Sequence, residues 1–146
     1  MPDRRIEHKL VARVLGVAQD IALRNQLEAG GLDAVFIRQN YHDLHDKFMG
    51  PADVAGFNKQ VFAALKPGGV YVVLDHAAPG TGLSATETLH RIDPATVKAE
   101  VTAAGFKFDG ESKALADPSD DHTHMVLETA VLGKTDQFLY RFRKPK

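Results

Sequence analysis

The stretch Lys66-Pro67-Gly68-Gly69-Val70-Tyr71-Val72-Val73-Leu74-Asp75-His76 decides the fold predicted for this chain. A Pro-Gly-Gly turn leads into an unbroken apolar run, Val70 to Leu74, before polar residues return at Asp75 and His76. Apolar residues that do not alternate with polar ones indicate a strand covered on both faces, as in the middle of a parallel sheet. Open α/β sheets bind ligands beyond the carboxyl ends of their strands, so we expect a functional site near Asp75.

A second strand is predicted upstream, over Leu32–Gln39, because a double glycine precedes a short run of bulky apolar residues. A helix should begin at Pro51, where the missing N–H of proline is tolerated, and end before Pro67. Strand, helix and strand in this order form a βαβ unit, whose crossover places the two strands parallel and side by side.

The remaining elements complete an α/β domain. Residues 4–29 have the apolar spacing of helices. Asp93 and Pro94 are typical of a helix start, and Gly105 of a helix end. Further strands are expected at 106–108 and 135–143, while residues 117–122 have the composition of an exposed loop.

Composition narrows the class of protein. The chain has 146 residues, of which 44% are apolar and 25% charged, with a net charge of -1. We expect one globular domain over residues 1–146, with no electrostatic preference for nucleic acid. The sequence contains no cysteine, which excludes disulfides and thiolate metal sites. No apolar run approaches the ~20 residues of a membrane helix, so no membrane contact and a cytoplasmic location are expected.

Several phrases of the sequence resemble the C-terminal half of class I S-adenosylmethionine-dependent methyltransferases. More narrowly, they are similar to a bacterial group described as predicted methyltransferases. The resemblance spans about residues 32–145. The phrases that carry it are Gln39–His45, Ala63–Asp75, Asp75–Gly82, Thr88–Pro94, Ala103–Phe106 and Thr135–Phe138.

The resemblance implies a truncated Rossmann-like methyltransferase sheet with strand order 4-5-7-6, the last strand antiparallel, and flanking helices. Residues 1–31 would be an N-terminal helical segment and residues 32–146 the methyltransferase-like half. The family grips its cofactor, S-adenosylmethionine, with a glycine-rich turn in the other half, but this sequence contains neither GxGxG nor GxGxxG. We therefore expect methyl transfer only if a partner or a second copy completes the cleft, and no competence in the isolated chain.

The strand Leu32–Gln39 would pair with a missing strand in the complete fold, which leaves an apolar edge. We expect this edge to be covered by the N-terminal helices or by a second copy of the chain, giving a homodimer or other homo-oligomer.

The loop after this strand carries the candidate catalytic residues. His42 and Asp43 are general-base candidates, because a base removes the proton of an oxygen or nitrogen methyl acceptor. Asn40 and Tyr41 are the candidate cofactor contacts. Asparagine and aspartate are also common turn residues that bond their own backbone, which is the alternative interpretation of Asn40 and Asp43.

The candidate contacts to a small-molecule substrate are Asp75, His76 and His90. Parallel neighbours would bring residues 40–43 and 75–76 together at one end of the sheet. His90 and Arg91 precede the cap at Asp93, where an anion could bind near a helix N-terminus.

Two alternatives come from other classes of protein. The chain could be a non-catalytic binding or oligomerisation module derived from a methyltransferase. The histidines and aspartates of residues 42–46, with His76 and His90, could also form a metal site. No HExxH motif is present and the surrounding sequence is not helical, so we predict no metal.

Overall fold

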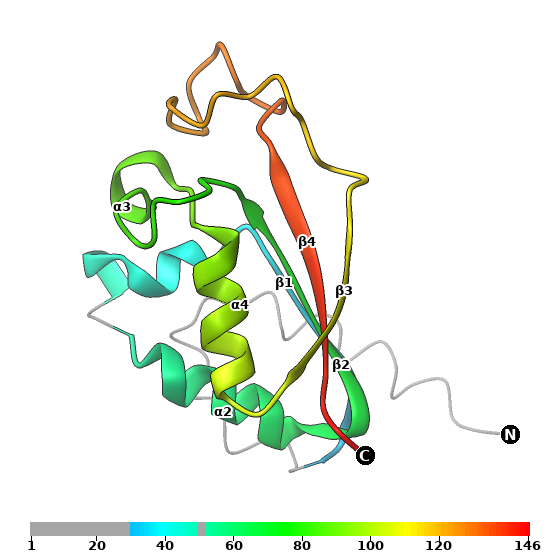
Figure 1. Ribbon diagram of the computed structural model, residues 1–146. Helices are drawn as coiled ribbons and strands as arrows, with labels where there is room; N and C mark the ends of the chain where they lie inside the picture. Colours follow the sequence, from blue (N-terminus) through cyan, green and yellow to red (C-terminus); the bar gives the residue numbers. More distant parts are fainter. Residues whose placement is uncertain (1–29, 50–51) are drawn as a thin grey trace, which may run out of the picture.

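The computed structural model describes residues 30–49 and 52–146, and the helices expected over residues 4–29 lie outside this part of the chain. A four-stranded sheet forms one layer and the helices form the other (Figure 1). The strands are β1 (Leu32–Arg38), β2 (Leu65–His76), β3 (Lys107–Ser112) and β4 (Gln137–Arg143). The helices are η2 (His42–His45), η3 (Lys47–Met49), α2 (Val54–Ala64), α3 (Thr86–Leu89) and α4 (Pro94–Ala103).

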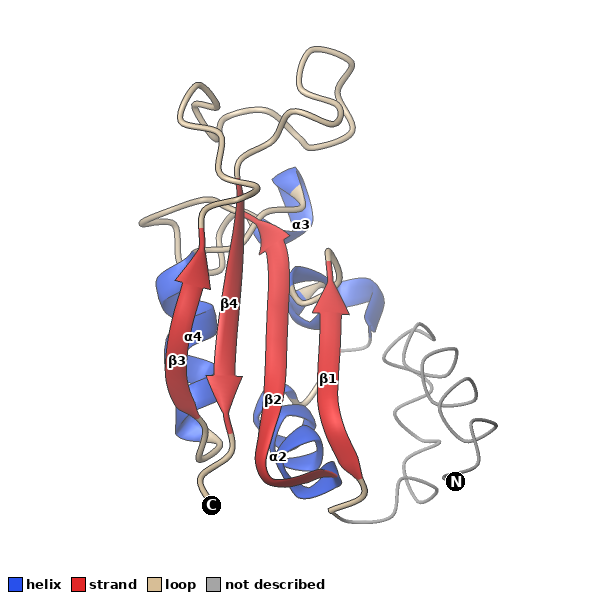
Figure 2. Cartoon of the chain, turned by 90° about the vertical axis from the view of Figure 1, so that its right-hand side faces the viewer, coloured by secondary structure: helices blue, strands red, loops and turns tan. Residues whose placement is uncertain are grey.

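The strand order is β1-β2-β4-β3, which confirms the order expected from the resemblance. β1 and β2 are parallel, with Val35 opposite Tyr71 and Ile37 opposite Val73. β4 is antiparallel to both β2 and β3 (Figure 2). The carboxyl ends of β1 and β2 therefore meet at the same edge, as a βαβ crossover requires.

The Lys-Pro-Gly-Gly phrase belongs to the start of β2 instead of preceding it. β2 begins at Leu65, opposite Leu32, and the register shifts before Val70 comes to lie opposite Ala34. Gly68 has φ 79° there, and a Cβ on Gly69 would lie 2.8 Å from the Lys66 carbonyl oxygen. Two glycines are thus needed where the chain bends into the apolar run.

The sheet is covered on one face by the described helices (Figures 1 and 2). On that face Tyr71, Val73 and Phe142 are fully buried and pack in the core with residues of α2 and α4. On the other face Phe36 is 47% exposed and Val72 is half-buried. The two faces of β2 are therefore covered to different extents within the described residues: Leu74, two residues after Val72, is 5% exposed, whereas Val72 is only half-buried. Val72 lies between Phe36 on β1 and Arg141 on β4.

Side-chain caps start both long helices. The Asp53 carboxylate accepts from the Gly56 N–H at 2.9 Å, so α2 begins at Val54 and not at Pro51. The Asp93 carboxylate accepts from the Ala95 N–H at 2.9 Å, and Pro94 is the first residue of α4, as predicted. None of the helices in the described ranges is long and apolar enough to cross a membrane.

Candidate functional site

The loop after β1 is fixed to the end of β2 by one aspartate. Asp75, the penultimate residue of β2, is fully buried. Its carboxylate accepts from the backbone N–H of His42 and of His76, each at 2.8 Å. The predicted meeting of residues 40–43 with residues 75–76 at one sheet edge is therefore confirmed: the parallel strands bring the segments together, and the Asp75 carboxylate links them.

The imidazole of His42 lies between two carboxylates. Nδ1 is 2.8 Å from Oδ1 of Asp75, and Nε2 is 3.2 Å from Oδ1 of Asp43. Burial by itself would lower the pKa of His42, but hydrogen bonds to Asp43 and Asp75 and their charges outweigh it and raise the pKa to about 10. His42 is therefore an imidazolium at neutral pH and cannot accept a proton there in this form.

Asp43, the second carboxylate beside His42, is half-buried. Burial would raise the pKa of Asp43, yet hydrogen bonds from His42 and Asn40 hold it below its ordinary value. The exposed Asn40 amide donates to Asp43 Oδ2 at 2.8 Å. His42 and Asn40 thus orient the Asp43 carboxylate and favour its charged form.

Asp46 and His90 complete what we call the His42 cluster: His42, Asp43, Asp46 and His90. One nitrogen or oxygen from each of the four residues lies within 4.8 Å of the others. Asp46 follows η2 and is 1% exposed, and neither of its carboxylate oxygens has a hydrogen-bond partner among residues 30–49 and 52–146. His90 is the capping residue that follows α3, and α3 packs against η2; the His90 ring centroid is 5.5 Å from that of His42.

Two predicted site residues are fully buried and have their polar side-chain atoms engaged by the fold. Tyr41 is 0% exposed; its hydroxyl donates to Glu100 at 2.9 Å and accepts from the Asn58 amide at 2.8 Å. Burial is also the main cause that raises the pKa of Tyr41. We assign Tyr41 to the core instead of to a cofactor contact, and Asp75 to the positioning of His42 instead of to a substrate contact.

Two further histidines are engaged elsewhere. His76 Nδ1 lies 2.7 Å from the Thr135 hydroxyl, and burial lowers the pKa of His76, so its ring is neutral at pH 7. His45 Nε2 lies 3.1 Å from Glu100 on α4. The His76 ring centroid lies 6.4 Å from that of His42, but among the described histidines only His42 and His90 place a ring nitrogen in the cluster.

A second buried group of charges joins the long connection between β3 and β4 to the sheet. We call it the Arg91 network. The Arg91 guanidinium is fully buried and donates to both oxygens of Asp120, at 2.7 and 3.2 Å. It also donates to the carbonyls of Ala77 and His124. Residues 117–122 are consequently not a wholly exposed loop as predicted, and Arg91 has a buried partner instead of an external anion.

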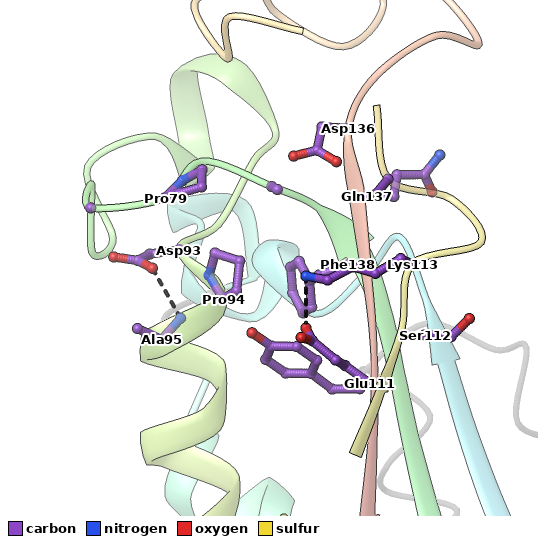
Figure 3. A pocket seen from close by; sticks show the side chains of 14 residues that line it. Pro79, Asp93, Pro94, Ala95, Glu111, Ser112, Lys113, Asp136, Gln137 and Phe138 are labelled. Carbon is purple, nitrogen blue, oxygen red and sulfur yellow. Dashed lines mark hydrogen bonds and ion pairs between the residues drawn. The ribbon is translucent and has the colours of Figure 1, made fainter. Parts of the chain in front are cut away.

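A hollow of about 480 Å³ lies between the loop after β2, the start of α4 and the ends of β3 and β4 (Figure 3). Its acidic groups are occupied by the fold: Asp93 caps α4, Glu111 pairs with Lys113 at 3.1 Å, and Asp136 accepts from the Asp117 N–H. It shares no lining residue with the His42 cluster, so the cluster and the hollow are separate sites.

The described sheet and helices match part of the fold of S-adenosylmethionine-dependent methyltransferases. A putative methyltransferase from Haloferax volcanii, solved with the Trm112 activator, has a TM-score of 0.53 at 14% identity over 82% of this chain and 56% of its own. The 1,6-didemethyltoxoflavin-N1-methyltransferase of Burkholderia thailandensis was solved with S-adenosylhomocysteine. It has a TM-score of 0.51 at 12% identity, over 81% of this chain and 46% of its own.

The [4+2]-cyclase SpnF is equally similar, with a TM-score of 0.53 at 12% identity over 80% of this chain and 52% of its own. The chain thus spans about half the length of these proteins. Identities this low show the fold alone, and a cyclase among the neighbours illustrates that one fold carries different reactions. No protein-family model matches the sequence, and no curated protein matches it.

Proposed function

We propose that this chain supplies the acceptor side of an S-adenosylmethionine-dependent methyltransferase. The observation that carries the proposal is the Asp75–His42–Asp43 array at the joined ends of β1 and β2. Ligands of open α/β sheets bind at this edge. Two of the similar solved structures are described as methyltransferases, one of them with S-adenosylhomocysteine bound.

In this function Asp43 is the catalytic carboxylate and His42 its positioning partner. The lone pair of an oxygen or nitrogen acceptor attacks the methyl carbon, the carbon–sulfur bond breaks, and its electron pair stays on sulfur as a thioether. The proton of the acceptor passes to Asp43, which His42 and Asn40 orient. Most of the rate would come from alignment of donor and acceptor.

Donor binding requires surfaces beyond those described. The family's glycine-rich turn is absent from the sequence, so a second copy or another chain would complete the cleft. The edge strand β1, with Phe36 47% exposed, is the proposed place of contact between copies. Asn40 is the one predicted cofactor contact that is exposed and remains proposed as such.

Calorimetric titration of the purified chain with S-adenosylmethionine and with S-adenosylhomocysteine tests the proposal, alongside light scattering for the mass in solution. We expect micromolar binding by an oligomer. Asn40→Ala should weaken this binding, while Asp43→Asn, on the acceptor side, should leave it unchanged. A monomer that gives no heat at millimolar donor contradicts the proposal.

The second candidate is a non-catalytic oligomerisation module derived from the same fold. The exposed Phe36 on an edge strand favours it, because apolar edges pair readily with other chains. An oligomer that dissociates on Phe36→Glu and binds no donor is the result expected of this alternative.

A further inference from the structure

We infer that the His42 cluster binds one divalent transition-metal ion of the zinc type through His42, Asp43, Asp46 and His90. The inference is drawn from these four side chains and does not rest on methyl transfer, for which only the metal-free chain would have Asp43 available as the base. Their donor atoms, one from each residue, already lie within 4.8 Å of one another. Ligand atoms held about 2.0–2.2 Å from a common ion lie ~3–4 Å from one another. Small rotamer changes would therefore bring the four donor atoms to coordinating distance.

The Asp46 carboxylate is the observation that points to a ligand. Asp46 is 1% exposed, and both of its oxygens lack a partner among the described residues. A buried carboxylate without a hydrogen bond is strongly unfavourable, and buried charges in proteins are paired or coordinate metals. A cation placed between Asp46 and His42 would satisfy it.

Asp75 holds the His42 ring in the way that metal-binding histidines are usually held by a hydrogen-bond acceptor. Metal-bound histidines usually give their other ring N–H to a carboxylate, which fixes the tautomer and the direction of the free nitrogen. Nδ1 of His42 faces the buried Asp75 at 2.8 Å, so Nε2 is directed toward Asp43. Binding of an ion at Nε2 would displace the proton that His42 now shares with Asp43.

Charge and donor type select the ion. Two neutral imidazoles and two carboxylates carry a charge of -2, which a divalent cation cancels. Imidazole nitrogen favours zinc, iron, nickel or copper over magnesium and calcium, which prefer oxygen throughout. Asp43 and His90 are only half-buried, which leaves a route for the ion from solvent.

The test uses the full chain, prepared without a histidine tag and treated with chelator, and titrated with ZnCl₂ by calorimetry. We expect one Zn²⁺ per chain, bound with micromolar affinity or better, and a higher melting temperature. Co²⁺ in its place should give visible absorption bands that report its coordination. Mg²⁺ should give no heat.

Asp75→Asn, which changes only the hydrogen-bond partner of a ligand, should weaken Zn²⁺ binding by roughly 10–100-fold. Asp46→Ala removes a ligand itself and should weaken the binding by more than this. Asp46→Asn keeps the shape of the side chain and should also lose affinity; it serves if the alanine variant does not fold. His124→Ala is the control and should bind like the parent, because the His124 ring pairs with the Glu128 carboxylate and is not one of the four proposed ligands.

Two outcomes would overturn the inference. One is no binding at ~100 μM Zn²⁺, far above the dissociation constants of built zinc sites. The other is binding that survives Asp46→Asn and disappears with His124→Ala, which would show that surface histidines capture the ion.

Discussion

The Arg91 network and the His42 cluster both contain buried charged groups at the same end of the sheet, yet only the first has all of its side-chain polar atoms paired among the described residues. Arg91 donates to Asp120 and to two carbonyls, and Asp120 also accepts from the backbone N–H groups of His122 and Asp136. In the His42 cluster, both oxygens of Asp46 have no partner within the residues described. A buried network that is fully satisfied stabilises a fold, whereas an unsatisfied one is a place where a ligand can contribute binding energy.

The largest effect is expected from breaking the Arg91 network. Arg91→Met should reduce the free energy of unfolding by about 3–5 kcal/mol, because it leaves Asp120 buried without its cation. Urea denaturation measures the change. The double variant Arg91→Met, Asp120→Asn removes the unpaired charge and keeps an oxygen acceptor for the backbone N–H groups, so it should recover part of the loss; equal destabilisation by single and double variants would contradict the pairing.

Acid should weaken the Arg91 network next. Burial would raise the pKa of Asp120, but hydrogen bonds from Arg91 and from the backbone N–H groups of Asp136 and His122 hold it below the ordinary value of 3.8. A depressed pKa contributes stability that is present above the unfolded pKa and is lost as the pH falls through the folded one. The melting temperature should therefore fall below about pH 4. Asp120→Asn should show a shallower fall, and parallel profiles would exclude this role.

A smaller effect of opposite sign is expected in the His42 cluster. Asp46→Ala should raise the metal-free unfolding free energy by about 1 kcal/mol, the order of cost of one unsatisfied buried acceptor. Chemical denaturation in chelator measures it, with the parent chain as reference. A loss of 2 kcal/mol or more would instead place Asp46 among satisfied structural groups.

The smallest effect is expected at the exposed rim of the cluster. Asn40→Ala removes the hydrogen bond to Asp43 but should change stability by no more than about 0.5 kcal/mol, as exposed substitutions usually do. Chemical denaturation of Asn40→Ala and Asp46→Ala in parallel compares their unfolding free energies. A change above 1 kcal/mol would mean that Asn40 holds the loop together.

Prediction from sequence succeeded where local chemistry decides the structure. Asp93 and Pro94 start α4, and the apolar run from Val70 identifies β2 as the inner partner of β1. The resemblance supplied the strand order, since periodicity cannot order strands. The start of β2 at Leu65 was missed because its pairing with Leu32 depends on a register shift that no local pattern announces.

The candidate site was predictable in place but not in roles. The meeting of residues 40–43 with Asp75 follows from parallel strands. The burial of Tyr41 and the distant partner of Arg91 do not, because Glu100 and Asp120 come from segments brought close only by tertiary packing. Asp46 carried a weak signal, as the second aspartate in Asp43-Leu44-His45-Asp46, but its missing partners appear only in three dimensions.

The bond from the His42 backbone N–H to Asp75 has a practical consequence. It attaches the start of the loop to the sheet through the main chain, which every amino acid at position 42 except proline can supply. Substitution of the His42 side chain therefore leaves this one attachment in place, so such a variant separates the chemistry of the ring from the position of the loop.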